Sequence, residues 1–451
     1  MSNTTDTTAE TPETPETPET PAVAAETPET PAVAAETPAV AATPAVDPRL
    51  LVREEGLKGY LSEFKRKVRG GELGSLPVVV GLAIIWVVFQ SQDSLFLTAT
   101  NLGNISFFLA ATGMLAIGLV FVLLLGEIDL SVGSVSGLSS AVFAVLSVSH
   151  GMNALLAVVL AIATGAAIGA LHGYFFAKLG VPAFVVTLAG NLGWNGLMLW
   201  LLGSTGSISI KDAGFLHLLG QQAFFMGSDI SGAYILAVLA VAALLGGSLI
   251  EQSRRRKAGV PFRATSEIAL RAGALALVAF GAAYMLNQAN GVPVALVIFL
   301  GALVVTDFVL RRTSYGRKIF AVGGSIEAAR RAGINVAMIR ISVYAISGAF
   351  AALGGLFFAA QTYTANLGAG GGNILMMAIA AAVIGGTSLF GGRGKTWSAL
   401  LGMLVIQSIQ TGLDLLNMNT SLQYMITGAV LLAAVVIDSL SRKTQKASGR
   451  G

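Results

Sequence analysis

Two acidic residues directly follow a long apolar run in the segment GEIDLSVGSVSG, residues 126–137. An ionisable side chain such as Glu127 or Asp129 is costly at membrane depth, so a carboxylate there usually binds a polar solute, gates a path or carries a proton. A local alternative exists, because Asp129 or Ser131 can cap the next helix by accepting from its free N–H groups. Gly133 also allows a helix break in this segment. We predict a gating or helix-break element here and leave both roles open.

The segment GGTSLFGGRGKT, residues 385–396, ends like a phosphate-binding loop. A Walker A loop needs a glycine where this chain has Leu389, and it follows a strand and not an apolar helix. The sequence therefore excludes nucleotide binding here and favours a flexible turn. Its glycines form a second predicted helix break: Gly385, Gly386, Gly391 and Gly392. The pattern glycine, leucine, glycine has the same spacing in residues 126–133 and 385–392, which is compatible with a parallel internal repeat.

Other chemistry-bearing residues are sparse. His150, His172 and His217 are far apart and accompany no ligand-spaced partner, so we interpret them as isolated structural histidines and predict no metal and no cofactor. The absence of cysteine excludes disulfides and thiolate sites. No Ser/His/Asp order, carboxylate pair in a cleft-forming domain or dinucleotide fingerprint is present, so we do not expect an enzyme.

The composition requires a membrane. Hydrophobic residues make up 54% of the chain and charged residues only 12%, outside the range of soluble domains. We predict an all-α, polytopic transmembrane helical bundle with about twelve spans, because runs long enough for a bilayer recur along the chain. These spans lie at 76–89, 105–125, 131–148, 154–177, 182–203, 233–250, 272–287, 293–310, 341–361, 374–385, 397–413 and 424–440.

The basic residues orient this bundle. If the N-terminus is cytoplasmic and the spans alternate, all 28 Lys and Arg except Lys211 fall on the cytoplasmic side. Both termini are then cytoplasmic, and the loop 204–232 is an outer segment that inserts partly. The formal charge of +4 is explained by basic helix ends that face anionic lipid, so we expect no nucleic-acid partner.

The ends of the chain have their own character. Residues 1–48 are rich in Thr, Pro, Glu and Ala and lack basic residues, so we expect a disordered tail without a secretory signal. Residues 49–72 are basic and amphipathic, as in an interfacial helix. The transmembrane domain is predicted over 73–441, and a basic cytoplasmic tail over 442–451.

Glycines at spacings of four mark a helix contact. Gly165, Gly169 and Gly173 lie on one face of the span 154–177. Small residues let membrane helices approach closely, because lipid offers no hydrophobic gain on association. We favour helix packing within the chain over a pore-lining groove.

The loop 311–340 carries a compact element. We predict a break at Gly323–Gly324, an N-cap at Ser325, and a short helix 326–332 that ends at Gly333. A solvated basic loop is the simpler interpretation. A rigid helix at the inner face is also what a membrane domain needs to pass movement to a soluble partner.

Three segments resemble the permease subunits of bacterial ABC importers for monosaccharides, in the same order and over residues 76–440. They are GEIDLSVGSVSG, YGRKIFAVGGSIEAARRAGINV and AIAAAVIGGTSLFGGRG. The insertion with QSRRRK at 252–257 and NGVP at 290–293 is most similar to the xylose-type permeases. The chain departs from the family pattern at Glu127, where glycine is common, and near Val343, where the usual Leu-Pro is missing.

The resemblance implies roles and partners. EAARRAG is similar to the element by which such permeases contact their ATPase, which implies that Glu327, Ala328, Ala329 and Gly333 couple to an ABC ATPase subunit. Further implied partners are an extracytoplasmic sugar-binding protein and a second copy of the chain, in the bacterial cytoplasmic (inner) membrane. The sugar would be a pentose such as xylose, and the ATPase subunit would hydrolyse ATP. A proton-coupled secondary transporter of a small polar solute, using Glu127 and Asp129, is the alternative.

Polar and aromatic residues at depth are candidates for a sugar path, because sugar rings suit aromatic faces and a few amides. Taken singly, each is more typical of a hydrogen bond between helices or of an interfacial belt. The candidates are Asn191, Trp194, Asn195, Gln361, Tyr363, Asn366 and Gln407.

Overall fold

The computed structural model describes residues 76–210, 216, 219, 223–224, 231–260 and 262–447. The predicted tail 1–48, the interfacial segment 49–72, Lys211, His217 and the last residues of the chain lie outside the described residues. So does most of the outer loop 204–232.

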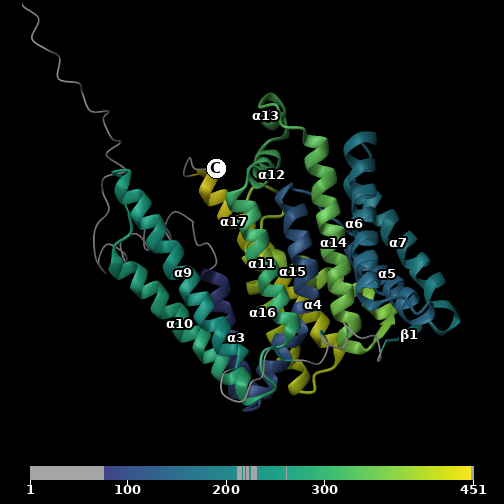
Figure 1. Ribbon diagram of the computed structural model, residues 1–451, viewed down its shortest axis with the longest axis horizontal. Helices are drawn as coiled ribbons and strands as arrows, with labels where there is room; N and C mark the ends of the chain where they lie inside the picture. Colours follow the sequence, from purple (N-terminus) through teal and green to yellow (C-terminus); the bar gives the residue numbers. More distant parts are fainter. Residues whose placement is uncertain are drawn as a thin grey trace, which may run out of the picture. The chain divides into compact units, whose positions relative to one another are not determined.

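The described residues form a bundle of α-helices (Figure 1). The helices are α3 (Leu76–Gln92), α4 (Ala99–Leu124), α5 (Val132–Ala144), α6 (Ala154–Leu179), α7 (Ala183–Leu202), α9 (Gly232–Lys257), α10 (Thr265–Gln288), α11 (Val294–Arg312), α12 (Ser314–Gly324), α13 (Ile326–Arg331), α14 (Val336–Thr362), α15 (Gly372–Ile384), α16 (Trp397–Leu415) and α17 (Thr420–Ala447). Three short helices are not α-helical: the π-helix η1 (Val145–Ser149) and the 3₁₀ helices η2 (Gly203–Thr205) and η3 (Leu367–Gly370).

Every predicted span has a helix at its place, and the polytopic all-α class is confirmed. Ten helices in the described part are long and apolar enough to cross a membrane. Two shorter apolar helices, 76–92 and 420–433, stand where the first and twelfth spans are predicted. The helix α17 continues to Ala447, so the predicted tail 442–451 begins as helix.

A small sheet was not predicted. β1 (Ser207–Ser209) pairs antiparallel with β2 (Thr364–Asn366), with Ser207 opposite Asn366. The two strands are only three residues long and lie far apart in the sequence, so neither gives a period-two pattern that can be recognised. The sheet joins the segment after α7 to the end of α14.

The core surrounds α4. Of its most apolar window, 89% is buried, and the helix packs against α14, α16, α15 and α11. Gly113 of α4 faces the ring of Phe299 from α11, and Gly354 of α14 faces Leu115. A helix that is apolar all round, such as α4, is expected to be enclosed by others.

The helices α6 and α14 run side by side and make the most extensive helix contact in the described part (Figure 1). The predicted glycine face mediates it. Gly165 contacts Gly348, Gly169 lies against the carbonyl oxygen of Tyr344, and a Cβ at Gly173 would stand 2.7 Å from the Cα of Ile341. The prediction that these glycines pack helices within the chain is confirmed.

The predicted loop 311–340 is largely helical. The structure has α12 where only a glycine break was predicted, and the chain leaves the helix after Gly324, at the extended residue Ser325. Gly323 lies within α12, and its missing side chain lets this helix approach the carbonyl oxygen of Leu124. The predicted break at Gly323–Gly324 therefore lies one or two residues too early. Gly323 serves close packing, whereas Gly324 has no atom within 4 Å of a would-be Cβ.

Candidate functional site

Asp129 is the acceptor at the end of a buried hydrogen-bond network. Its side chain is 2% exposed, between the end of α4 and the start of α5. Its Oδ1 accepts from the Ser131 backbone N–H at 2.9 Å and from the Ser131 hydroxyl at 2.6 Å. Its Oδ2 accepts from the Ser347 hydroxyl of α14 at 3.3 Å. Three donors satisfy a group that would otherwise be costly to bury.

The network continues into α6 and α7. The indole N–H of Trp194 donates to Nε2 of His172 at 2.9 Å, and Nδ1 of His172 lies 3.1 Å from the Ser131 hydroxyl. An indole can only donate, so Nε2 must be an acceptor and the hydrogen of the neutral imidazole sits on Nδ1. His172 then donates to Ser131, and Ser131 donates to Asp129. All donors point in one direction, toward the carboxylate.

This network decides the capping question. Ser131 stands at the N-cap position of α5, but its side chain caps no helix N–H group. The hydroxyl donates to Asp129 instead, so the capping prediction is wrong for Ser131. Asp129 accepts from the N–H of the N-cap residue itself and thereby fixes the entry into α5. Gly133 permits a close approach of Gly370, because the Gly370 carbonyl oxygen lies 3.2 Å from the place that a Cβ of residue 133 would occupy.

Glu127 pairs with an arginine of α14. Nε of Arg340 lies 3.1 Å from Oε1 of Glu127, and the side chains are 16% and 10% exposed. The guanidinium also stacks on the ring of Phe176, 4.2 Å from its centre. Burial raises the pKa of Glu127 to about 7, although the Arg340 charge lowers it. Glu127 therefore belongs to an ion pair beside the network and not to the network itself.

Glycine backbones from three segments meet beside Glu127. The N–H of Gly392 donates to the carbonyl oxygen of Leu124 at 2.9 Å. A Cβ at Gly391 would lie 2.8 Å from the carbonyl oxygen of Gly323 and 2.9 Å from the nitrogen of Gly126. Gly126, Gly391 and Gly392 also have positive φ angles, which glycine adopts without strain. We call Gly126, Gly323, Gly391 and Gly392 the glycine junction.

The other two predicted break glycines lie at the end of α15. Gly385 packs against the carbonyl oxygen of Ser398, and Gly386 has a φ angle of +103°. The N–H of Thr387 donates to the carbonyl oxygen of Ala382. At the end of α4, the N–H of Glu127 donates in the same way to the carbonyl oxygen of Val122. Both are bonds of the helix-ending Schellman type, with the positive-φ glycine just before the donor.

The predicted repeat is therefore shifted by one residue. Gly126 and Gly386 have the same positive-φ conformation. The predicted spacing had instead aligned Gly126 with Gly385. The reason is that only the positive-φ position needs glycine for its backbone. Gly385 instead needs its small size for packing.

The predicted short helix is present as α13, at the end of the bundle beyond α12 (Figure 1). Ser325 caps it by accepting from the N–H of Ala328 at 3.3 Å, and Gly333 ends it with a φ angle of +75°. Both end signals are confirmed. Glu327 and Ala328 are exposed and Ala329 is buried, so α13 attaches to the bundle by one face and presents the other outward.

The path candidates separate into two groups. On α7, the amide of Asn195 donates to Asn191 at 3.3 Å, and its oxygen would lie 3.5 Å from a Cβ at Gly370 of η3. Tyr363 and Asn366 flank and enter β2, which contacts α5 as α7 does. The structure therefore brings the α7 candidates and the β2 region together around α5.

The remaining candidates have local partners. Gln361 donates to the carbonyl oxygen of Phe107 at 2.6 Å, a hydrogen bond between helices. Gln407 donates to Thr411 at 3.3 Å on α16, which packs against α15, α4 and α3. Gln407 thus lies away from the other candidates, and Trp194 belongs to the buried network.

Sequence reasoning missed His172, Arg340 and Ser347 as members of the site. His172 was interpreted as isolated, although it follows Gly165 and Gly169 at helical spacing and so shares their packing face. That spacing is a usable signal. Arg340 and Ser347 gave none, because their partners are more than 200 residues away in the sequence. In the described part, no group of three or more His, Asp or Glu could hold a metal.

Comparison with known proteins gives the family. The family described as "Branched-chain amino acid transport system / permease component" matches residues 101–435. The chain is 36% identical to the xylose transport system permease protein XylH of Escherichia coli K12 over 366 residues, 80% of this chain and 90% of that protein. The chain belongs to the ABC sugar permeases. It is a multi-pass membrane permease and not itself an enzyme.

Two further relatives place this permease within the family. XylH of Haemophilus influenzae is 34% identical over 382 residues, 84% of this chain and 99% of that protein. The ribose import permease protein RbsC of Bacillus subtilis is 30% identical over 377 residues, 84% of this chain and 96% of that protein. No solved structure matches the permease.

Proposed function

We propose that this permease is the membrane subunit of an ATP-driven importer that moves a pentose such as xylose across the bacterial inner membrane. The observation that carries the choice of sugar is the identity of 36% to a xylose permease, against 30% and 32% to two ribose permeases. The α9–α10 hairpin, which carries the insertion that resembles xylose-type permeases, supports the same choice.

The geometry supports a route for coupling. The ATPase subunit binds the exposed face of α13 around Glu327 and Ala328, and ATP is hydrolysed there and not in the permease. Because α12 leads into α13 and its Gly323 is part of the glycine junction, displacement of α13 is passed to the segment with Glu127 and Asp129. Movement of that segment opens the bundle alternately to each side.

The remaining partners follow from the same mechanism. An extracytoplasmic sugar-binding protein delivers the sugar, and a second copy of the permease completes the path. The basic residues at the helix ends support a cytoplasmic location for α13 and for both termini. Asn191, Asn195, Tyr363 and Asn366 are the proposed contacts along the path. Trp194, Gln361 and Gln407 are left out of this set, because their side chains bond to the partners described above. The family favours this importer over the proton-coupled alternative.

Uptake into right-side-out vesicles tests the proposal. The permease and its ATPase are reconstituted with ATP inside, and loaded binding protein with labelled xylose or ribose is added outside. We expect xylose entry that requires ATP and binding protein and persists when an ionophore collapses the proton gradient. Entry without ATP that stops with the gradient would support the carrier, and preference for ribose would overturn the choice of sugar.

A charge reversal tests the coupling helix. Glu327 is largely exposed, at 71% of its side chain, so Glu327→Lys should change stability by about 0.5 kcal/mol or less. We expect the variant to assemble in the membrane but to lose the ATP hydrolysis that loaded binding protein stimulates. The matched control is Glu251→Lys, a charge reversal at the end of a different helix. Normal stimulation in Glu327→Lys would contradict the coupling role.

A further inference from the structure

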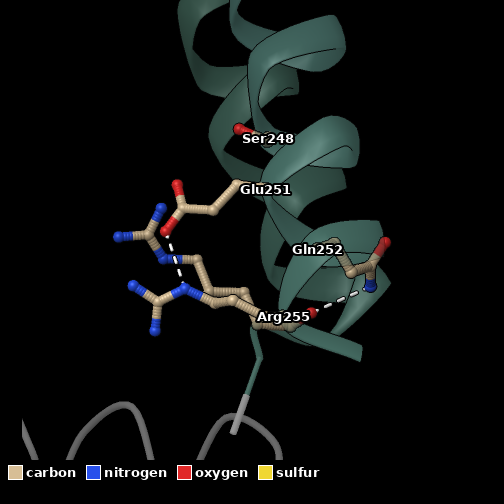
Figure 2. Close-up of a pocket in the computed structure, with 5 residues that line it drawn as sticks. Ser248, Glu251, Gln252 and Arg255 are labelled. Atoms are coloured by element: carbon tan, nitrogen blue, oxygen red, sulfur yellow. Dashed lines mark hydrogen bonds and ion pairs between the residues drawn. The ribbon is translucent and has the colours of Figure 1, made fainter. Parts of the chain in front are cut away.

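The α9–α10 hairpin has a concave polar site at the end where its two helices join. Gln252 holds the connection closed, because its amide donates to the Arg263 carbonyl oxygen at 2.9 Å and to the Thr265 hydroxyl at 3.3 Å. A cavity of about 140 Å³ lies there, lined by Ser248, Glu251, Gln252, Arg255 and Arg263 (Figure 2). This volume exceeds what a single water molecule needs.

The end of the hairpin that holds the cavity carries more basic than acidic residues. Six basic and two acidic residues lie between 251 and 271. Glu251 forms an ion pair with Arg255 at 2.9 Å, as Figure 2 shows, and this contact orients the arginine in the cavity wall. Glu267 lies 3.0 Å from Arg271 and 3.8 Å from Arg263. Within the described ranges, Arg254, Arg256 and Lys257 form no ion pair, so the excess charge is not neutralised locally.

Apolar surface begins directly beside this charge. Leu249, Ile250, Phe262 and Leu270 are 41–59% exposed. Only 11% of the apolar window of α9 and 17% of that of α10 are buried within the chain. Most of the apolar surface of both helices is therefore not covered by the rest of the chain, and the cavity lies where this apolar band ends. A soluble partner does not match a boundary between charged and apolar surface. An anionic lipid does, because its charged headgroup adjoins its apolar acyl chains.

We propose that this cavity binds the phosphate of an anionic phospholipid headgroup. Arg255 and Arg263 flank the phosphate, the Ser248 hydroxyl donates to it, and the acyl chains lie along Leu249 and Ile250. Guanidinium groups suit this task because they form charge-assisted hydrogen bonds with phosphate oxygens. Basic residues at the end of a membrane helix do not by themselves indicate a binding site, because they also serve to orient the helix in the membrane. The evidence for a site is the cavity, to which α9 contributes one arginine and the linker before α10 contributes the other.

The test is lipid binding by the purified full-length permease, measured by native mass spectrometry with phosphatidylglycerol, phosphatidylcholine or inorganic phosphate. The first variant combines Arg255→Gln with Arg263→Gln. The matched control combines Arg254→Gln with Arg256→Gln, which removes equal charge from the same end of the hairpin outside the cavity wall. We expect phosphatidylglycerol affinity to fall roughly tenfold further in the first variant than in the control.

A second variant removes the cavity and keeps the charge. Ser248→Phe should fill the space and also weaken phosphatidylglycerol binding, while phosphatidylcholine binds weakly to every form. Equal losses in the two double variants would show diffuse attraction and overturn the site, as would full binding to Ser248→Phe. Competition by inorganic phosphate at concentrations near those of the lipid would show an ion site and overturn the lipid assignment.

Discussion

Two helix pairs of similar length use the same residue types in opposite ways. The pair α6–α14 and the pair α9–α10 both contain glycines and charged or polar groups in apolar helices. In the first pair, Gly165, Gly169 and Gly173 touch the backbone of the other helix. In the second, Gly247, Gly273 and Gly281 have no atom within 4 Å of a would-be Cβ in the described part. A glycine thus reports close packing only where a second backbone is present.

The polar groups show the same contrast. Asp129, His172 and Ser347 are buried. Ser347 donates to Asp129 directly, and His172 is joined to Asp129 through Ser131, which links α5 to α6 and α14. Glu251 and Arg255 on α9 form an ion pair with side chains 42% and 53% exposed. Exposed pairs contribute little to stability, whereas a buried network that loses one member leaves costly unpaired groups. Substitutions in the first pair should therefore be far more damaging.

The largest effect is expected from Gly169→Leu. A side chain there would overlap the Tyr344 carbonyl oxygen and force α6 away from α14, at a cost of about 3 kcal/mol or more. We expect little folded protein in detergent by size-exclusion chromatography and thermal unfolding. Gly247→Leu on α9 is the control and should express normally. If both variants behave alike, the contrast between the helix pairs is not one of packing.

The second-largest loss of stability is expected from replacement of Asp129. Asp129→Leu leaves the Ser131 N–H and two hydroxyl groups without their acceptor, at about 2–4 kcal/mol. Asp129→Asn keeps an oxygen toward Ser131 and offers an amide to Ser347, so most sugar uptake should remain. Loss of uptake in the Asn variant at full expression would instead indicate that the carboxylate charge is needed.

Glu127 should give stability a pH dependence. Burial raises the pKa of Glu127 to about 7, so the folded permease favours the protonated form more than the unfolded chain does. The stability of the wild type relative to Glu127→Gln is then highest below the unfolded pKa of about 4.3 and falls as pH rises through 7. Between pH 5 and 7 we expect the difference in unfolding free energy to fall by about 2 kcal/mol. A constant difference across that range would refute the effect.

The smallest effect is expected at the exposed pair of α9. Glu251→Gln should change the unfolding free energy by about 0.5 kcal/mol or less, and added salt should reduce even that difference. Thermal unfolding at low and high salt measures it. A loss comparable with that of Asp129→Leu would show that the hairpin is held together by this ion pair.

The sequence by itself determined the class of the molecule. Bilayer-length apolar runs require helices because lipid cannot satisfy backbone groups, which is why each predicted span matches a helix. The short helix α13 was also predictable, since Ser325 and Gly333 mark its ends through bonds made within a few residues. The spacing of Gly165, Gly169 and Gly173 predicted a contact face, and the segments shared with sugar permeases predicted the family.

Only the tertiary structure decided which partners these residues meet. The spacing at α6 could not name α14 as the partner helix, because any second backbone satisfies a glycine face. Glu127 and Asp129 are two residues apart, yet one pairs with Arg340 and the other accepts from Ser347, over separations of 213 and 218 residues. Their environments diverge because the two side chains meet α14 about two turns apart, at Arg340 and at Ser347. No local pattern encodes these partners, since the contacts exist only once the helices have packed.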